Sequence, residues 1–123
     1  MQCGADSLFG DPIDLKNQFN VSTSGYCDCI GLVIEKAIPA IFLGGGGYNF
    51  ANTARLWCSI TGMLARKKLT RDIPEHNDFL SYGPSYELAS SAGTNTPNKN
   101  TAEYATAILS RCLDNLDLLN ARE

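Results

Sequence analysis

The sequence predicts an α/β fold built on parallel strands, and two neighbouring features of the chain support this prediction. Residues 40–43 form an apolar run with no polar position, which is typical of a strand buried on both faces of a parallel sheet. The run ends in four consecutive glycines, and apolar residues at helical spacing begin directly after them. In open α/β sheets, a turn of this kind lies at the carboxyl edge of the strands, where ligands bind.

The first third of the chain supplies a second strand and a crossover helix. Residues 1–3 start as an extended segment and lead into a glycine and the carboxylate of Asp6. Residues 22–37 are expected to form a helix with Ser22 or Thr23 as its N-cap. This order predicts a parallel crossover, which places Asp6 at the same edge as the glycine turn. On spacing alone, Asp6 is more simply interpreted as a loop or cap carboxylate.

Two further helices are expected. The second begins at Asn49 or Asn52 and ends in the basic run at residues 66–68, where cations complement the helix dipole. The last begins at a capping box formed by Asn100 and Glu103. Its apolar face is expected to pack on a core and consists of Tyr104, Ile108, Leu109, Cys112, Leu116 and Leu119.

Composition excludes several classes of protein. The 123 residues suit one domain, and a net charge of -3 gives no electrostatic reason to expect binding to nucleic acid or to an anionic membrane. No apolar run approaches the ~20 residues needed to span a bilayer, and no secretory signal is visible. The five cysteines are an odd number, which favours reduced thiols in a cytosolic or nuclear protein.

The glycine turn does not fit the common nucleotide-binding motifs. A phosphate-binding P-loop needs Gly-Lys-Ser/Thr at its end, whereas Gly47 is followed by Tyr48 and Asn49. A dinucleotide fingerprint needs a third glycine where Asn49 or Phe50 stands. A turn that only packs a helix on a strand needs one or two glycines, so four of them favour close approach of a ligand to the backbone.

The predicted elements do not make a complete domain. Two parallel strands are too few to form a stable sheet, and three amphipathic helices carry more apolar surface than two strands can cover. We therefore expect residues 1–123 to be the C-terminal part of a larger α/β domain, whose N-terminal strands lie outside this chain.

Six segments, together with Trp57 and Tyr86, give the chain its resemblance to a known family. These segments are residues 2–7 (QCGADS), 10–12 (GDP), 43–49 (LGGGGYN), 52–55 (NTAR), 73–76 (IPEH) and 82–84 (YGP). They resemble class I histone deacetylases over most of the chain. The resemblance implies an arginase/deacetylase-like doubly wound parallel sheet with a zinc site at its carboxyl edge, of which this chain would be about the last third.

The resemblance also implies roles for single residues. Asp6 resembles a zinc ligand, and Tyr48 resembles the phenol that donates a hydrogen bond to the acetyl carbonyl and its tetrahedral intermediate. The wall of the acetyl-lysine tunnel would comprise Gly45, Gly46 and Gly47, with Ile13 near the pocket. The family's Asp-x-His ligand pair and His-His base pair have no counterpart in these residues, so the isolated chain should be inactive. A site with two carboxylates and one histidine would also accept iron(II).

Two positions indicate a branch within class I. Relatives that join co-repressor complexes through an inositol phosphate carry arginine at the positions of Pro12 and Ala51, so such binding is not expected here. The same two residues make the chain similar to the type 8 branch, which works alone. The implied substrates are acetylated lysines of histones or other proteins, in the nucleus or the cytoplasm.

Two functions remain open. The first is a zinc-dependent lysine deacetylase of which this chain is a part. The second is a catalytically inactive remnant that acts only as a packing or interaction module.

Overall fold

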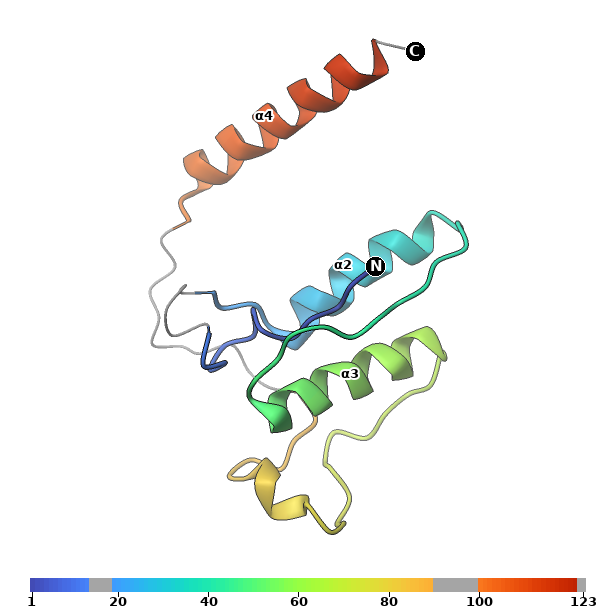
Figure 1. Ribbon diagram of the computed structural model, residues 1–123, viewed down its shortest axis with the longest axis vertical. Coiled ribbons are helices and arrows are strands. Elements are labelled where there is room, and N and C mark those ends of the chain that lie inside the picture. The colour runs from blue at the N-terminus through green and yellow to red at the C-terminus, as the bar shows by residue number, and fades with distance from the viewer. Residues whose placement is uncertain (14–18, 90–99, 122–123) are drawn as a thin grey trace. The chain divides into compact units, whose positions relative to one another are not determined.

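A computed structural model of the protein describes residues 1–13, 19–89 and 100–121. It divides into two compact units, Met1–Gly93 and Thr94–Glu123. The first unit contains helices α2 (Thr23–Glu35) and α3 (Phe50–Leu64) and the short 3-10 helix η1 (Phe79–Tyr82). The second contains α4 (Ala102–Asn120) (Figure 1).

Two extended segments run parallel through the first unit, as the sequence predicts. Gln2 and Leu43 form a parallel bridge. The backbone N–H of Cys3 donates to the carbonyl of Leu43 at 2.8 Å, and the N–H of Leu43 donates to the carbonyl of Met1 at 2.9 Å. A further bond joins the N–H of Ala5 to the carbonyl of Gly46 at 2.6 Å. The end of the first segment is thereby fixed beside the glycine turn.

The doubly wound parallel sheet is not confirmed, because the described residues contain isolated bridges and no extended strand. The predicted burial of residues 40–43 is wrong for this chain, since Ile41 is 75% exposed and Leu43 is 60% exposed. A strand becomes buried on both faces only when neighbouring strands and helices cover it. The two paired segments have no third strand beside them in the described part of the chain.

Helices α2 and α3 pack against each other, and Gly31 of α2 lies against the side chain of Met63 of α3 (Figure 1). From α2, the phenol of Tyr26 donates to the carbonyl of Gly4 at 2.8 Å. From α3, the indole N–H of Trp57 donates to the carbonyl of Cys3 at 2.8 Å. The buried apolar core shared by these two helices and the first segment consists of Cys3, Ala5, Leu8, Ile30, Leu56 and Ile60.

The starts of α2 and α3 confirm two predicted N-caps. The side chain of Ser22 accepts a hydrogen bond from the N–H of Gly25 at 3.1 Å. The side chain of Asn49 accepts one from the N–H of Asn52 at 3.1 Å. Each cap satisfies a backbone donor that has no partner within the first turn of its helix. Helix α2 ends at Glu35, two residues before its expected end.

The predicted end of the second helix is wrong. Helix α3 stops at Leu64 because Arg66 adopts a left-handed conformation with φ 52°. The N–H of Lys67 then donates to the carbonyl of Gly62 and that of Arg66 to the carbonyl of Met63, which is the Schellman pattern. The basic residues 66–68 therefore follow the helix and do not form its last turn.

Helix α4 begins one residue later than predicted, with Thr101 as its N-cap in place of Asn100. The hydroxyl of Thr101 accepts a hydrogen bond from the N–H of Tyr104 at 3.1 Å. The six apolar residues expected on one face are exposed in this unit, so their packing on a core stays a prediction. In the described part of the chain, no helix combines the length and apolar character needed to cross a membrane.

Candidate functional site

The glycine turn packs directly on the end of the first extended segment. A Cβ on Gly45 would overlap the side chain of Gln2, and one on Gly46 would overlap the carboxylate of Asp6. A Cβ on Gly47 would lie 2.9 Å from that of Ala5, and Gly47 also has a φ of +138°. A Cβ at any of these positions would force Gln2, Asp6 or Ala5 to shift, so glycine allows the turn to pack this closely on the first segment.

These contacts change the interpretation of the four glycines. We expected a packing turn to need only one or two, yet a Cβ on Gly44 would also lie 3.1 Å from the ring of Trp57. Packing within the chain therefore accounts for all four glycines. The predicted role of Gly45, Gly46 and Gly47 as the wall of a substrate tunnel stays a prediction.

The turn brings the carboxylate of Asp6 close to the backbone that carries Tyr48. Asp6 is half-buried at the end of the first segment, where it faces Gly46. Tyr48 lies two residues after Gly46 along the chain and keeps 52% of its surface exposed. A half-buried carboxylate can act as a metal ligand, and an exposed phenol can donate a hydrogen bond to a bound carbonyl group.

A third residue, Asp11, links the two loops of the site. Its side chain is 1% exposed, and its carboxylate accepts three backbone hydrogen bonds. Oδ2 accepts from the N–H of Tyr48 at 2.6 Å and from that of Asn49 at 3.1 Å. Oδ1 accepts from the N–H of Ile13 at 3.0 Å, two residues along the chain. Asp11 thus ties Ile13, predicted to lie near the pocket, to the loop of Tyr48.

The sequence assigns no role to Asp11, although residues 10–12 (GDP) are among the segments that carry the family resemblance. Aspartate followed by proline is a common turn signal. In such turns the aspartate side chain accepts a hydrogen bond from the backbone N–H two residues on, as Asp11 does from Ile13. That signal identifies the turn. The contact with Tyr48 spans 37 positions, so no local pattern reports it.

Behind Asp6, the phenol of Tyr26 supports the same loop. It donates to the carbonyl of Gly4 at 2.8 Å. Burial raises the pKa of Tyr26, although hydrogen bonds from Ser7 act in the opposite direction, and the negative charge of Asp6 raises it further. The phenol therefore keeps its proton near neutral pH and remains a donor to the loop that carries Asp6.

The described residues do not form a complete metal site. Within them, no group of three or more histidine, cysteine, aspartate or glutamate side chains could hold a metal ion. A catalytic zinc site takes three protein ligands and leaves a position open. Asp6 fits one of these ligands, and the described part of the chain does not complete a set of three.

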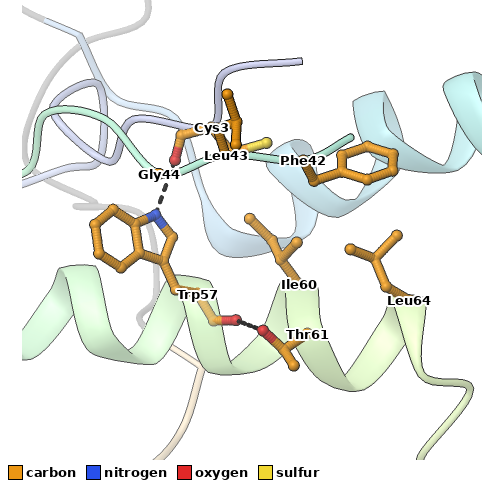
Figure 2. A pocket seen from close by; sticks show the side chains of 8 residues that line it. All are labelled: Cys3, Phe42, Leu43, Gly44, Trp57, Ile60, Thr61 and Leu64. Carbon is orange, nitrogen blue, oxygen red and sulfur yellow. Dashed lines mark hydrogen bonds between the residues drawn. The ribbon is translucent and has the colours of Figure 1, made fainter. Parts of the chain in front are cut away.

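An apolar cavity of about 260 Å³ lies beside the turn, between α3 and the paired segments (Figure 2). Trp57 borders it and donates to the carbonyl of Cys3, while the hydroxyl of Thr61 donates to the carbonyl of Trp57 at 2.7 Å. Its lining consists of Cys3, Phe42, Leu43, Gly44, Trp57, Ile60, Thr61 and Leu64. The residues that line it are mostly apolar, and none of them carries a charged side chain.

Comparison with known proteins identifies a matching family. The profile of the histone deacetylase domain matches residues 1–64, just over half of the chain. The matched part includes Asp6, Asp11 and Tyr48 together with the whole glycine turn and α3.

Three curated proteins illustrate the similarity. Histone deacetylase 1 of rice is 42% identical over 97% of this chain, histone deacetylase 8 of zebrafish 38% over 94%, and histone deacetylase RPD3 of budding yeast 39% over 95%. The chain spans 22%, 30% and 26% of the lengths of these proteins, respectively. Because the domain profile covers more than half of the chain and includes its site, the protein belongs to the histone deacetylase family.

Proposed function

We propose that this chain is the C-terminal part of the catalytic domain of a zinc-dependent lysine deacetylase. The observation that carries the proposal is the contact between Asp6 and Gly46, which brings a carboxylate close to the backbone that presents Tyr48. The reaction would hydrolyse N6-acetyl-lysine on histones or other proteins. The names of the matched relatives support this class of reaction.

In this proposal, Asp6 is one of the zinc ligands. A zinc ion held there would polarise the acetyl carbonyl and lower the pKa of a bound water. The Asp-x-His ligand pair and the His-His base pair would come from a part of the domain outside this chain. The same donor set would also accept iron(II).

Tyr48 would act on the carbonyl oxygen of the substrate. Its side chain is half-exposed beside the turn, so the phenol is free to face a bound acyl group. As negative charge develops on that oxygen, a hydrogen bond from the phenol strengthens and stabilises the transition state. Gly45, Gly46, Gly47 and Ile13 would lie along the path of the acetyl-lysine side chain.

The apolar surface of the first unit supports the proposal that residues 1–123 are an incomplete domain. Ile38, Ile41 and Leu43 lie on or directly before the second extended segment, and all three are exposed. Side chains of this size are normally covered in a folded domain. The missing strands of the sheet would cover them, and the isolated chain would be inactive.

The partners and location of the protein are part of the same proposal. Acetylated lysine side chains would be its substrates, in the nucleus or the cytoplasm. Pro12 and Ala51 replace the arginines expected of relatives that bind an inositol phosphate, so co-repressor recruitment by that route is not proposed.

One observation favours a second candidate function. The apolar residues of α4, among them Leu109, Leu116 and Leu119, are exposed in the unit that contains them. A chain that kept only such faces would act as a packing or interaction module without catalysis. The two candidates differ in whether the chain can complete an active domain.

The test uses a complete domain, made by placing this chain behind the N-terminal part of the zebrafish relative. Hydrolysis of an acetyl-lysine peptide and the zinc content are measured on the same sample. We expect Asp6→Asn to lose both activity and metal, because an anionic ligand is removed. Tyr48→Phe should keep its zinc and lose about 10²–10³ in kcat, with little change in KM.

The outcomes separate the candidates. A complete domain that binds zinc but does not hydrolyse the peptide would favour the interaction module. Unchanged zinc content in Asp6→Asn would show that Asp6 is a loop carboxylate and not a zinc ligand. A near-normal kcat in Tyr48→Phe would remove the proposed role of its phenol.

A further inference from the structure

Among the described residues of the first unit, Asp11 has the least exposed polar side chain, at 1%. A buried charge is costly unless hydrogen bonds replace the water that it loses. Asp11 meets this requirement with three backbone N–H groups, those of Ile13, Tyr48 and Asn49. Hydrogen bonds to an ionised acceptor are stronger than those between neutral groups, so the ionised form of Asp11 anchors both loops firmly.

The segment before Tyr48 has little rigidity of its own. Four glycines precede it, and glycine permits many backbone conformations at similar energy. The bond from the N–H of Ala5 holds the turn at Gly46, and contacts beyond Gly46 must fix the direction of the Tyr48 backbone. Asp11 provides such a contact at 2.6 Å, and the side-chain amide of Asn49 adds a longer contact to the carbonyl of Gly10 at 3.5 Å.

We propose that Asp11 is a positioning residue for Tyr48, which it holds through the backbone so that the phenol faces the substrate carbonyl. This inference rests on the proposed role of Tyr48. Asp11 itself has no contact with substrate in the proposal. The alternative is that Asp11 only stabilises the start of α3, whose N-cap is Asn49.

The substitution Asp11→Asn separates shape from charge. The amide has nearly the shape of the carboxylate, but only one of its two ends accepts hydrogen bonds. In either orientation, the NH₂ group of the asparagine faces at least one backbone N–H that Asp11 now binds. The turn should shift slightly, and small misplacements of a reacting group are costly in rate. We expect kcat to fall about 10- to 100-fold, with KM and zinc content changed less than about twofold.

A double-mutant cycle tests whether Asp11 acts through Tyr48. It compares the complete domain with Asp11→Asn, Tyr48→Phe and the double variant, using kcat per zinc-loaded site. If Asp11 positions the phenol, Asp11→Asn should lower kcat in the parent and have almost no further effect in Tyr48→Phe. Ser22→Ala is the matched control, because it removes another side-chain acceptor of a backbone N–H, that of Gly25. It should leave kcat per loaded site unchanged.

Each other outcome overturns the inference, and the outcomes identify which proposal fails. An equal loss of kcat in both backgrounds would show that Asp11 acts independently of Tyr48. Normal kcat in Asp11→Asn, together with a large loss in Tyr48→Phe, would reject the inference alone. Normal kcat in Tyr48→Phe would reject the proposed function and this inference with it. If Asp11→Asn yields no zinc-loaded domain, Asp11→Glu, which keeps the charge, is carried through the same cycle with the same criteria.

Discussion

Gly46 lies so close to Asp6 that a Cβ on the glycine would overlap the carboxylate of the aspartate. The hydrogen bond from the N–H of Ala5 to the carbonyl of Gly46 holds the two residues in this register. The position of the candidate metal ligand therefore depends on the absence of a side chain in the turn opposite. Neither residue can shift without disturbing the other.

We predict that Gly46→Ala in the complete domain weakens metal binding although it removes no ligand. The new methyl group must displace the carboxylate of Asp6, and changes to the groups that orient a ligand typically cost about 10- to 100-fold in metal affinity or activity. The measurement is zinc affinity by competition with a chelator. Gly25→Ala is the control, because a Cβ there meets its nearest atoms at 3.5 Å and lies within α2. Equal zinc affinities in the two variants would contradict the prediction.

The side chain of Arg55 joins α3 to the segment that follows it. It is 6% exposed, and its guanidinium donates to the carbonyl of Glu87 at 2.8 Å, to that of Tyr82, and to the side-chain oxygen of Asn52 at 3.1 Å. It also lies 5.1 Å from the centre of the Tyr82 ring, which suits a cation–π contact.

We predict that Arg55→Met destabilises the complete domain by about 1–3 kcal/mol, because it leaves the partly buried carbonyl groups of Tyr82 and Glu87 without this donor. Arg71→Gln is a matched control. The guanidinium of Arg71 also binds Glu87, at 2.8 Å from the Glu87 carboxylate, but the Arg71 side chain is 78% exposed. An exposed pair of this kind contributes little to stability, because water screens it. Denaturant unfolding of both variants measures the difference. Similar losses of unfolding free energy in the two variants would show that the contacts of Arg55 contribute no more to stability than the exposed pair of Arg71.

The start of α4 should respond to acid through Glu103. Its carboxylate accepts hydrogen bonds from its own backbone N–H and from the Thr101 hydroxyl, which lower the pKa of Glu103. A lowered pKa in the helix means that the ionised form stabilises it above the ordinary glutamate value of about 4.3. This contribution is lost as the pH falls through the lowered pKa.

The test is the circular dichroism of a peptide of residues 100–121 between neutral pH and pH about 2. Glu103→Gln removes this titration and leaves the other acidic residues of the peptide in place. We expect the parent to be the more helical of the two at neutral pH and to lose this advantage in acid. If the difference in helicity between the parent and Glu103→Gln peptides did not change with pH, ionised Glu103 would not be the group that stabilises the start of α4.

The parts of the fold that could be predicted from the sequence are those that depend on local signals. Ser22 and Asn49 cap their helices as expected, because a cap uses a side chain and a backbone group three residues apart. The parallel pairing of Gln2 with Leu43 followed from the order of the elements. The end of α3 at Leu64 was missed because a left-handed arginine, Arg66, ends it where glycine is the usual residue.

The parts that could not be predicted depend on distant residues. The predicted burial of residues 40–43 relied on neighbouring layers that the described chain does not contain. The contacts of Asp11 with Tyr48 and of Arg55 with Glu87 span 37 and 32 positions, and periodicity carries no information at such separations. Asp6 and Tyr48 were singled out by resemblance to a family, whereas Asp11, which links the two loops, was found only in the structure.

The last prediction concerns the stability of the 123-residue chain by itself. Among the described residues, six apolar side chains form the buried core, while Ile38, Ile41 and Leu43 remain exposed on or just before an extended segment that bridges only the first one. A core of this size gives little cooperative stability, and open strand edges promote association between chains. We expect the isolated chain to melt over a broad temperature range or to aggregate, and the complete domain to show a sharp transition. Thermal circular dichroism combined with size-exclusion chromatography measures both properties. A monomeric chain with a sharp two-state transition would show that the exposed surface needs no partner, and would remove the main structural support for an incomplete domain.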